Sequence, residues 1–204
     1  IAEYAKSMAR LGFEVEQIES SMLDTARASQ ALGVGLATMG EVVGKTLNAF
    51  GLGTASSGRV TNTLVKALNT SALTFEAFQL SMQYVAPIAA KLNVTLEETT
   101  AYMSLLANAG FKASKIGTGL RTIFIELGSE SVDLTEHLKE LSDQNLSLAQ
   151  AEELVGKRAA AQFLTILNGV DAVEALTDAY KEQDAVSVAA AKQMDTDVER
   201  LKQL

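Results

Sequence analysis

The residues of this chain that could serve as acids, bases or metal ligands are few and scattered. His137 is the only histidine and there is no cysteine, so the usual ligands of a zinc site are missing. His137 also shares a helical pattern with Leu134, Leu138 and Leu141, which indicates a structural position on an amphipathic helix. A Ser-His-Asp triad would need this histidine and a G-x-S-x-G turn, which the sequence lacks. We therefore predict no catalytic, cofactor-binding or metal-binding residue, and no cofactor.

Two pairs of neighbouring carboxylates, Glu97–Glu98 and Glu152–Glu153, invite comparison with glycosidases, which use two acidic residues. Both pairs are predicted at helix starts, where the helix dipole favours negative charge. An enzyme that degrades cell walls would also need aromatic platforms for sugars, and the chain has no tryptophan. We predict that the chain is not an enzyme, and a muralytic segment is the least favoured alternative.

Gly117-Thr118-Gly119 could be mistaken for part of a phosphate-binding loop. The Walker pattern requires Lys and then Ser or Thr after the second glycine, whereas Leu120 and Arg121 follow here. The small residues instead predict a helix that packs closely against its neighbour.

The composition favours a core built by packing helices on one another. Of the 204 residues, 48% are hydrophobic but only 5% are aromatic, so Ala, Leu, Val and Met must fill the core. The formal net charge of −8 argues against a basic nucleic-acid-binding face, and no sequence-specific recognition of nucleic acid is expected. The charge changes along the chain, with six basic and three acidic residues from 59 to 121 but seven basic and sixteen acidic residues from 122 onward.

Apolar residues recur at spacings of three and four almost everywhere, which predicts an all-α, multi-helix, bundle-like fold without a β-sheet. The penultimate helix is expected to break near Gly156 and the last near Asp184. The ten predicted helices lie near residues 1–11, 14–31, 36–50, 57–69, 74–91, 95–109, 114–127, 133–142, 147–168 and 171–203.

Residues typical of helix starts and ends support the limits of these helices. Glycine caps are predicted where a helical pattern ends, and capping boxes where a Ser, Thr or Asp precedes Glu or Gln by three residues. The predicted glycine caps are Gly12, Gly51, Gly110 and Gly169, and the boxes are Thr95 with Glu98, Asp133 with Glu136, Ser147 with Gln150, and Asp171 with Glu174.

Other small or rigid residues lie within predicted helices. Pro87 is the only proline and predicts a kink, because its ring crowds the preceding turn. Gly40 and Gly44 predict close contact with a neighbouring helix. The longest uncharged run, residues 77–90, is too short for the roughly 20 residues of a membrane-spanning helix.

The change of charge near Gly128–Val132 predicts a hinge between two lobes. Residues 1–128 would form a helical front lobe and residues 129–204 an acidic helical C-terminal lobe. Ile1 and Leu204 both fall within helical patterns, which predicts that the chain is a piece of a longer one.

Four motifs follow one another between Asn69 and Leu127, and they resemble the core of the tape-measure proteins of long-tailed phages and prophages. Two flanking segments extend the resemblance over nearly the whole chain, while Ala113, Gly119 and Val155 depart from the family pattern. The motifs are Tyr84-Val85-Ala86-Pro87, Leu96-Glu97-Glu98-Thr99, Leu106-Ala107-Asn108-Ala109-Gly110 and Gly117-Thr118-Gly119-Leu120-Arg121, and the flanking segments are Leu47-Asn48-Ala49-Phe50-Gly51-Leu52 and Val155-Gly156-Lys157-Arg158-Ala159.

The resemblance implies a structural protein that sets tail length during assembly and helps DNA enter the cell at infection. It also implies a homo-oligomer, a trimer or hexamer, in contact with the tail tube, tail-tip or baseplate hub proteins and assembly chaperones, with the host inner membrane as a further partner at infection. The expected location is the virion, in the tail-tube lumen or at the tip, and the host cytoplasm during assembly.

The pattern of short helices bears on how this segment could act. A continuous helix of this length would extend about 306 Å, whereas a compact fold would have a radius of gyration of about 17 Å. Frequent caps favour a globular domain over the measuring rod itself. The alternative function is a membrane-active helical domain in a conduit for DNA ejection, since the segments near 36–50 and 74–91 are apolar.

Overall fold

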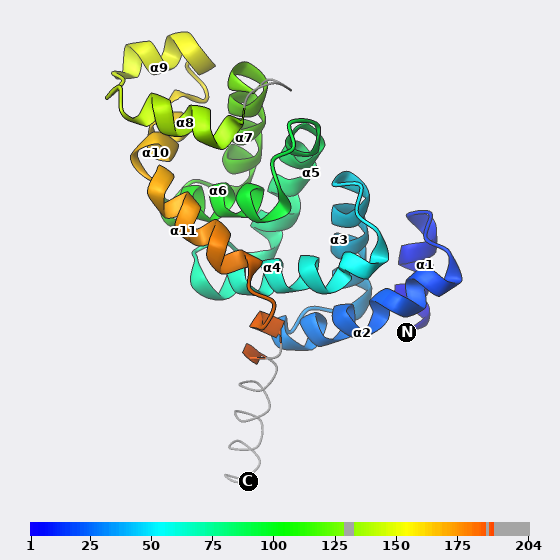
Figure 1. Ribbon diagram of the computed structural model, residues 1–204. Coiled ribbons are helices and arrows are strands. Elements are labelled where there is room, and N and C mark those ends of the chain that lie inside the picture. The colour runs from blue at the N-terminus through cyan, green and yellow to red at the C-terminus, as the bar shows by residue number, and fades with distance from the viewer. Residues whose placement is uncertain (129–132, 187, 190–204) are drawn as a thin grey trace, which may run out of the picture. The chain divides into compact units, whose positions relative to one another are not determined.

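The computed structural model describes residues 1–128, 133–186 and 188–189. Within these ranges it contains eleven α-helices, one short 3-10 helix and no strand (Figure 1), which confirms the all-α prediction. The elements are α1 (Ala2–Arg10), α2 (Val15–Leu32), α3 (Leu36–Ala49), η1 (Thr54–Ser56), α4 (Ser57–Thr70), α5 (Phe75–Lys91), α6 (Leu96–Asn108), α7 (Ala113–Leu127), α8 (Leu134–Ser142), α9 (Leu148–Val155), α10 (Ala160–Asn168) and α11 (Val170–Lys181).

The chain forms two compact units. One contains residues 1–66 together with the described residues from Lys181 onward, and the other contains Ala67–Tyr180. The change of charge at residue 128 coincides with neither limit, and helices from both sides of it pack together in the second unit, where α9 and α10 contact α7. Residues 129–132 of the predicted hinge lie outside the described residues.

In the first unit, α1 lies against α3 because two glycines leave room for it. A Cβ atom on Gly40 would collide with the ring of Tyr4, and one on Gly44 would lie 2.7 Å from Leu11 and 3.0 Å from Met8. Tyr4 is 1% exposed and its hydroxyl lies 2.8 Å from Oγ of Ser21 on α2. The close helix contact predicted for both glycines is therefore confirmed.

The end of the described chain returns to this unit. The backbone N–H of Val186 donates to Oδ1 of Asn62 on α4 at 3.0 Å, and Lys66 donates to Glu182 at 2.6 Å. The helix ends at Lys181 and resumes after residue 184, so the predicted break near Asp184 is confirmed. The predicted continuation beyond residue 189 lies outside the described residues.

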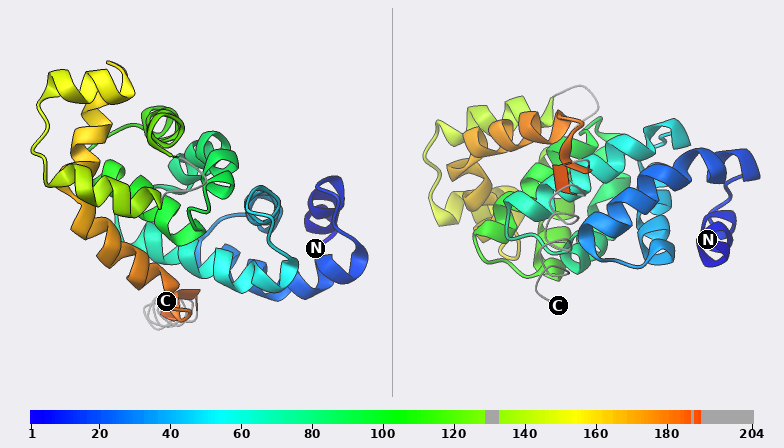
Figure 2. Two further views of the ribbon diagram at one scale, coloured as in Figure 1. Left: turned by 45° about the horizontal axis from the view of Figure 1, so that its top comes forward. Right: turned by 90° about the horizontal axis from the view of Figure 1, so that it is seen from below.

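The core of the second unit is built around α5, α6 and α7, and α5 and α7 lie side by side (Figure 2). Phe78, Tyr102 and Phe124 are at most 1% exposed. The rings of Tyr102 and Phe124 meet edge to face with centroids 5.7 Å apart, a favourable aromatic geometry. The hydroxyl oxygen of Tyr180 on α11 lies 2.8 Å from Oγ of Ser104 on α6. This hydrogen bond fixes α11 on α6.

All four predicted glycine caps lie where a helix ends, and three of them adopt the left-handed conformation. Gly12, Gly51 and Gly110 have positive φ, and at Gly110 the N–H of Phe111 returns to the carbonyl of Leu106 at 3.0 Å, as in a Schellman motif. Gly169 is the C-cap of α10, as predicted, but its φ of −125° lies outside the left-handed region. This glycine leaves room for Leu105 instead, whose side chain would lie 2.8 Å from an added Cβ.

Helix starts follow the predictions in three of four cases. Complete capping boxes occur at Thr95 and Ser147. Asp133 accepts hydrogen bonds from two backbone N–H groups of α8, but Glu136 does not complete the predicted box. The prediction for Asp171 is wrong, because α11 already begins at Val170 and Asp171 lies in its first turn. A further capping box, which was not predicted, occurs at Glu14.

The two interruptions expected within long helices have different outcomes. The break near Gly156 is confirmed, because α9 ends at Val155 and α10 begins at Ala160. Pro87 lies inside α5, which continues through it to Lys91, and a kink there stays a prediction. None of the helices in the described ranges combines the length and apolarity needed to cross a membrane.

Tyr102 makes the second unit sensitive to alkaline pH. Burial, aided by the carboxylates of Glu98 and Asp133, raises the pKa of Tyr102 well above its ordinary value, while its hydrogen bond to Thr135 opposes the shift. In the unfolded chain this group ionises near pH 10. The stabilisation that the raised pKa of Tyr102 gives to the folded unit is therefore complete below pH 10. It is lost as the pH rises toward the pKa of Tyr102 in the folded state.

We expect the stability of the wild type relative to Tyr102→Phe to fall by about 1.4 kcal/mol between pH 9 and pH 11. Urea unfolding of both proteins at the two pH values measures this difference. Groups that titrate in both proteins contribute equally to the two free energies of unfolding. Their contributions cancel in the difference between the wild type and the phenylalanine variant. A difference that does not change with pH would contradict the prediction.

Candidate binding groove between α5 and α7

The close approach of α5 and α7 depends on Gly117. A Cβ atom at this position would lie 2.8 Å from Cα and 2.9 Å from the carbonyl oxygen of Ser81 on α5. The hydroxyl of Ser81 donates to the carbonyl oxygen of Ala113, at the start of α7, at 2.9 Å. On another side of α7, a Cβ on Gly119 would lie 3.0 Å from Gln162 of α10. The predicted packing role of the Gly117–Gly119 segment is therefore confirmed.

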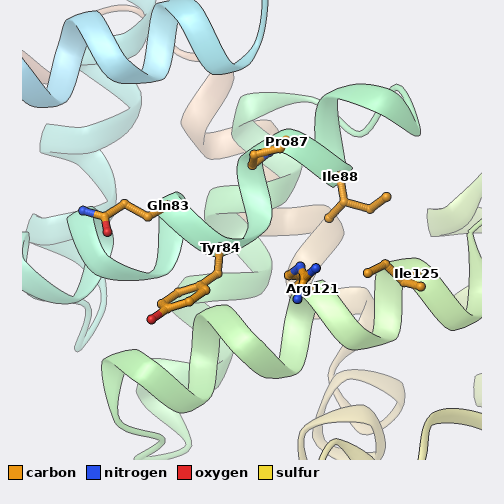
Figure 3. A pocket seen from close by; sticks show the side chains of 6 residues that line it. All are labelled: Gln83, Tyr84, Pro87, Ile88, Arg121 and Ile125. Atoms are coloured by element: carbon orange, nitrogen blue, oxygen red, sulfur yellow. The ribbon is translucent and has the colours of Figure 1, made fainter.

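An open groove of about 380 Å³ runs along the line where α5 and α7 meet. Tyr84 extends from α5 over α7, and Arg121 lies between the two helices (Figure 3). Positions three and four residues apart share one face of a helix, which explains how each helix presents its lining residues together. These residues are Gln83, Tyr84, Pro87 and Ile88 from α5, and Arg121 and Ile125 from α7.

The groove combines exposed apolar surface with one positive charge. Tyr84 is 41% and Ile125 46% exposed, although both are large side chains that are usually covered when they lie together. Arg121 is exposed and forms no hydrogen bond or ion pair with the described part of the chain. A guanidinium group binds carboxylates through paired hydrogen bonds. The groove is therefore suited to an apolar segment that carries an acidic residue.

The residues that line the groove include no carboxylate, imidazole or thiol group. The only charged side chain among them is Arg121, and a guanidinium group donates hydrogen bonds but has no acceptor atom. His137 lies elsewhere, on α8, with Nδ1 3.7 Å from Oε2 of Glu140. The described residues contain no group of three His, Asp or Glu side chains that could hold a metal ion.

The two carboxylate pairs do not share one explanation. Glu98 completes the capping box of α6, and Glu97 beside it is 2% exposed, so this pair does lie at a helix start. Glu152 and Glu153 lie in the second half of α9, whose first turn has no acidic residue. The helix-dipole explanation is therefore wrong for Glu152–Glu153.

This groove was not predicted from the sequence, because the residues of the motifs were all expected to be packing residues. Val85 and Ala89 are indeed buried, but Tyr84 and Pro87 of one motif and Arg121 of another are exposed. A signal was present, since Tyr84 and Ile88 fall outside the apolar stripe that passes through Val85 and Ala89. An aromatic side chain off the buried stripe of a helix indicates a surface role.

Comparison with known proteins identifies the class of molecule that carries this groove. The sequence matches the family described as "Phage-related minor tail protein" over residues 1–196. The chain belongs to this family. Over 95% of the present chain, the sequence is 26% identical to the tape measure protein of Pneumococcus phage Dp-1. Over 46% of the present chain, it is 30% identical to the probable tape measure protein of Escherichia phage P2. No solved structure matches it.

These similarities confirm the expected resemblance to tape-measure proteins. Membership of the minor tail protein family supports a structural role in a phage tail, association with other tail proteins and a location in the tail of the virion. The matched regions span 19% of the Dp-1 protein and 12% of the P2 protein, so the chain corresponds to a small part of these relatives.

Proposed function

We propose that the chain is a helical part of a phage or prophage tape-measure protein, which sets tail length during assembly and takes part in DNA delivery at infection. The observation that carries this proposal is the family match over residues 1–196. The similarity to the Dp-1 tape measure protein over 95% of the chain supports it. The relatives' names describe no enzyme, and the groove offers a binding surface without catalytic groups.

Within such a protein, this segment contributes two compact helical units and not the measuring rod. The longest helix in the described part of the chain, α2, has 18 residues and a length of about 27 Å, against about 306 Å for one continuous helix of the whole segment. The contact between α5 and α7 supports a globular arrangement for the second unit. The extended part that measures the tail would then lie in the remainder of the longer protein.

The partners and location of the proposed ruler follow from this role. Copies of the protein would assemble as a trimer or hexamer, inside the tail tube or at its tip. The tube, the tail-tip or baseplate hub and the assembly chaperones would bind the assembled protein, and the host inner membrane would meet it at infection. Assembly would take place in the host cytoplasm.

An in-frame deletion of residues 1–204 from the full tape-measure gene tests the proposal. If the segment is a compact part of the ruler, the phage should make no normal tails, or make tails shortened by far less than about 306 Å. Electron microscopy gives the tail lengths, and the number of genomes that enter the cell per adsorbed particle gives DNA delivery. The unmodified phage is the reference for both measurements.

Two outcomes would contradict separate parts of the proposal. Tails shortened by about 306 Å would show that the segment is extended in the tail, and the compact arrangement would be wrong. Tails of unchanged length with unchanged DNA delivery would contradict the proposal that this segment takes part in either process.

A further inference from the structure

Arg121 and Ile125 lie next to each other on the groove side of α7. They lie four residues apart, so their side chains project from the same face one turn from each other. Arg121 is exposed and Ile125 is 46% exposed. One helix face thus presents a positive charge followed, one turn later, by an uncovered apolar side chain.

A complementary pair lies on α9, in the same unit. Leu148 is 55% exposed, and Glu152 follows it four residues later on the same side of the helix. Ala151 and Val155 are buried and hold α9 on its own unit. The carboxylate of Glu152 forms no hydrogen bond or ion pair with the described part of the chain. This short helix therefore offers an apolar side chain and a negative charge at the spacing found on α7.

We propose that the groove between α5 and α7 binds α9 of a second copy of this chain. With the two helices antiparallel, Arg121 meets Glu152 and Ile125 meets Leu148, because each pair spans one helical turn in the opposite direction. Tyr84 and Ile88 cover the other side of the incoming helix. The proposal rests on the self-association included in the proposed function and names the contact that produces it.

One copy cannot form this contact with itself. Within a single chain α9 already packs against α7, with Ala151 and Val155 turned inward, while Leu148 and Ile125 both stay exposed. The donor helix and the acceptor groove are different surfaces, so the contact is head-to-tail. Such a contact produces a closed ring or an open filament and not a two-fold dimer.

Charge reversal tests the contact in the purified chain by sedimentation at increasing protein concentration. Arg121→Glu places a carboxylate in the groove against the carboxylate of Glu152, and Glu152→Arg places a guanidinium group on α9 against that of Arg121. Each variant alone should associate about fivefold to tenfold more weakly than the wild type, because a like-charged pair replaces an opposite one at a surface site. Raised salt should weaken association of the wild type as well.

Mixing the two variants is the decisive measurement. In the mixture, the groove of the Arg121→Glu variant meets α9 of the Glu152→Arg variant, and the unchanged groove of the second variant meets the unchanged α9 of the first. In an open filament or a six-membered ring, alternating copies therefore restore an opposite-charge pair at every contact, and association should return to near the wild-type level. In a three-membered ring, two of the three contacts are restored, and the recovery should be partial. Recovery on mixing requires the two groups to lie on different molecules, which no effect on the folding of either variant can reproduce.

Two matched variants control for net charge. Lys115→Glu changes an exposed residue of α7 outside the groove, and Glu153→Arg changes the neighbour of Glu152 on another side of α9. Both should associate as the wild type does. The proposal is overturned if the wild type stays monomeric at every concentration, if the mixture does not recover, or if the controls weaken association equally. None of these results would alter the tail lengths measured after the deletion, so the two proposals fail separately.

Discussion

Replacement of Gly117 by valine is expected to destabilise the 67–180 unit by about 3 kcal/mol or more. The new Cβ would lie 2.8 Å from Cα and 2.9 Å from the carbonyl oxygen of Ser81, and these are backbone atoms that no side-chain rotation can move aside. α5 and α7 would have to separate, which would open the core beside Phe124. The gain in helix propensity on removing a glycine, about 1 kcal/mol or less, does not offset this loss.

Thr118→Val is the matched control, because it places the same side chain one position farther along α7, on the exposed face. It loses only the hydrogen bond from Thr118 to the carbonyl of Ser114 and should change stability by less than about 0.5 kcal/mol. Urea unfolding gives both free energies. Hydrogen exchange should place the loss caused by Gly117→Val in α5 and α7. Equal stabilities of the two variants would show that the helices can separate at little cost.

Helix limits were predictable from the sequence because they depend on neighbouring residues. The capping box at Thr95 needs only Glu98 three residues later, and the Schellman turn at Gly110 needs only a residue that accepts positive φ. Both are local requirements that a single sequence displays. This explains why most predicted helices begin and end within two residues of those in the structure.

The errors arose where a distant residue decides the local structure. At Gly169 the helix ends as predicted, but the glycine is required by the side chain of Leu105 beside it and not by a positive φ. No neighbour of Gly169 in the sequence indicates that contact. The limits of the two compact units were missed for the same reason, because the bond from Val186 to Asn62 joins residues far apart in the chain.

The candidate groove depends both on local sequence patterns and on contacts between distant residues. The motifs that contain Tyr84 and Arg121 were singled out from the sequence, but they come from different helices. Only the approach of α7 to α5 through Gly117 places these side chains along one groove. Helical periodicity could separate exposed from buried positions on each helix, but it could not bring the two exposed faces together.

Phe124→Ala is expected to cost the same unit about 4 kcal/mol, the usual range for a buried phenylalanine being about 3–5 kcal/mol. The Phe124 side chain is fully buried, and its ring meets that of Tyr102 edge to face at 5.7 Å. The substitution leaves a cavity and removes an aromatic pair worth about 0.5–1.5 kcal/mol beyond the buried area. A loss of this size is a large fraction of the stability of a small domain.

Ile125→Ala is the control at the next position, and it separates stability from binding. Ile125 is 46% exposed and lines the groove, so its truncation should cost less than about 1 kcal/mol in urea unfolding. The same variant should still weaken self-association, because Ile125 faces Leu148 of the second copy in the proposed contact. Similar losses of stability for Phe124→Ala and Ile125→Ala would mean that α7 does not present one buried face and one free face. In that case the groove could not be an open binding surface.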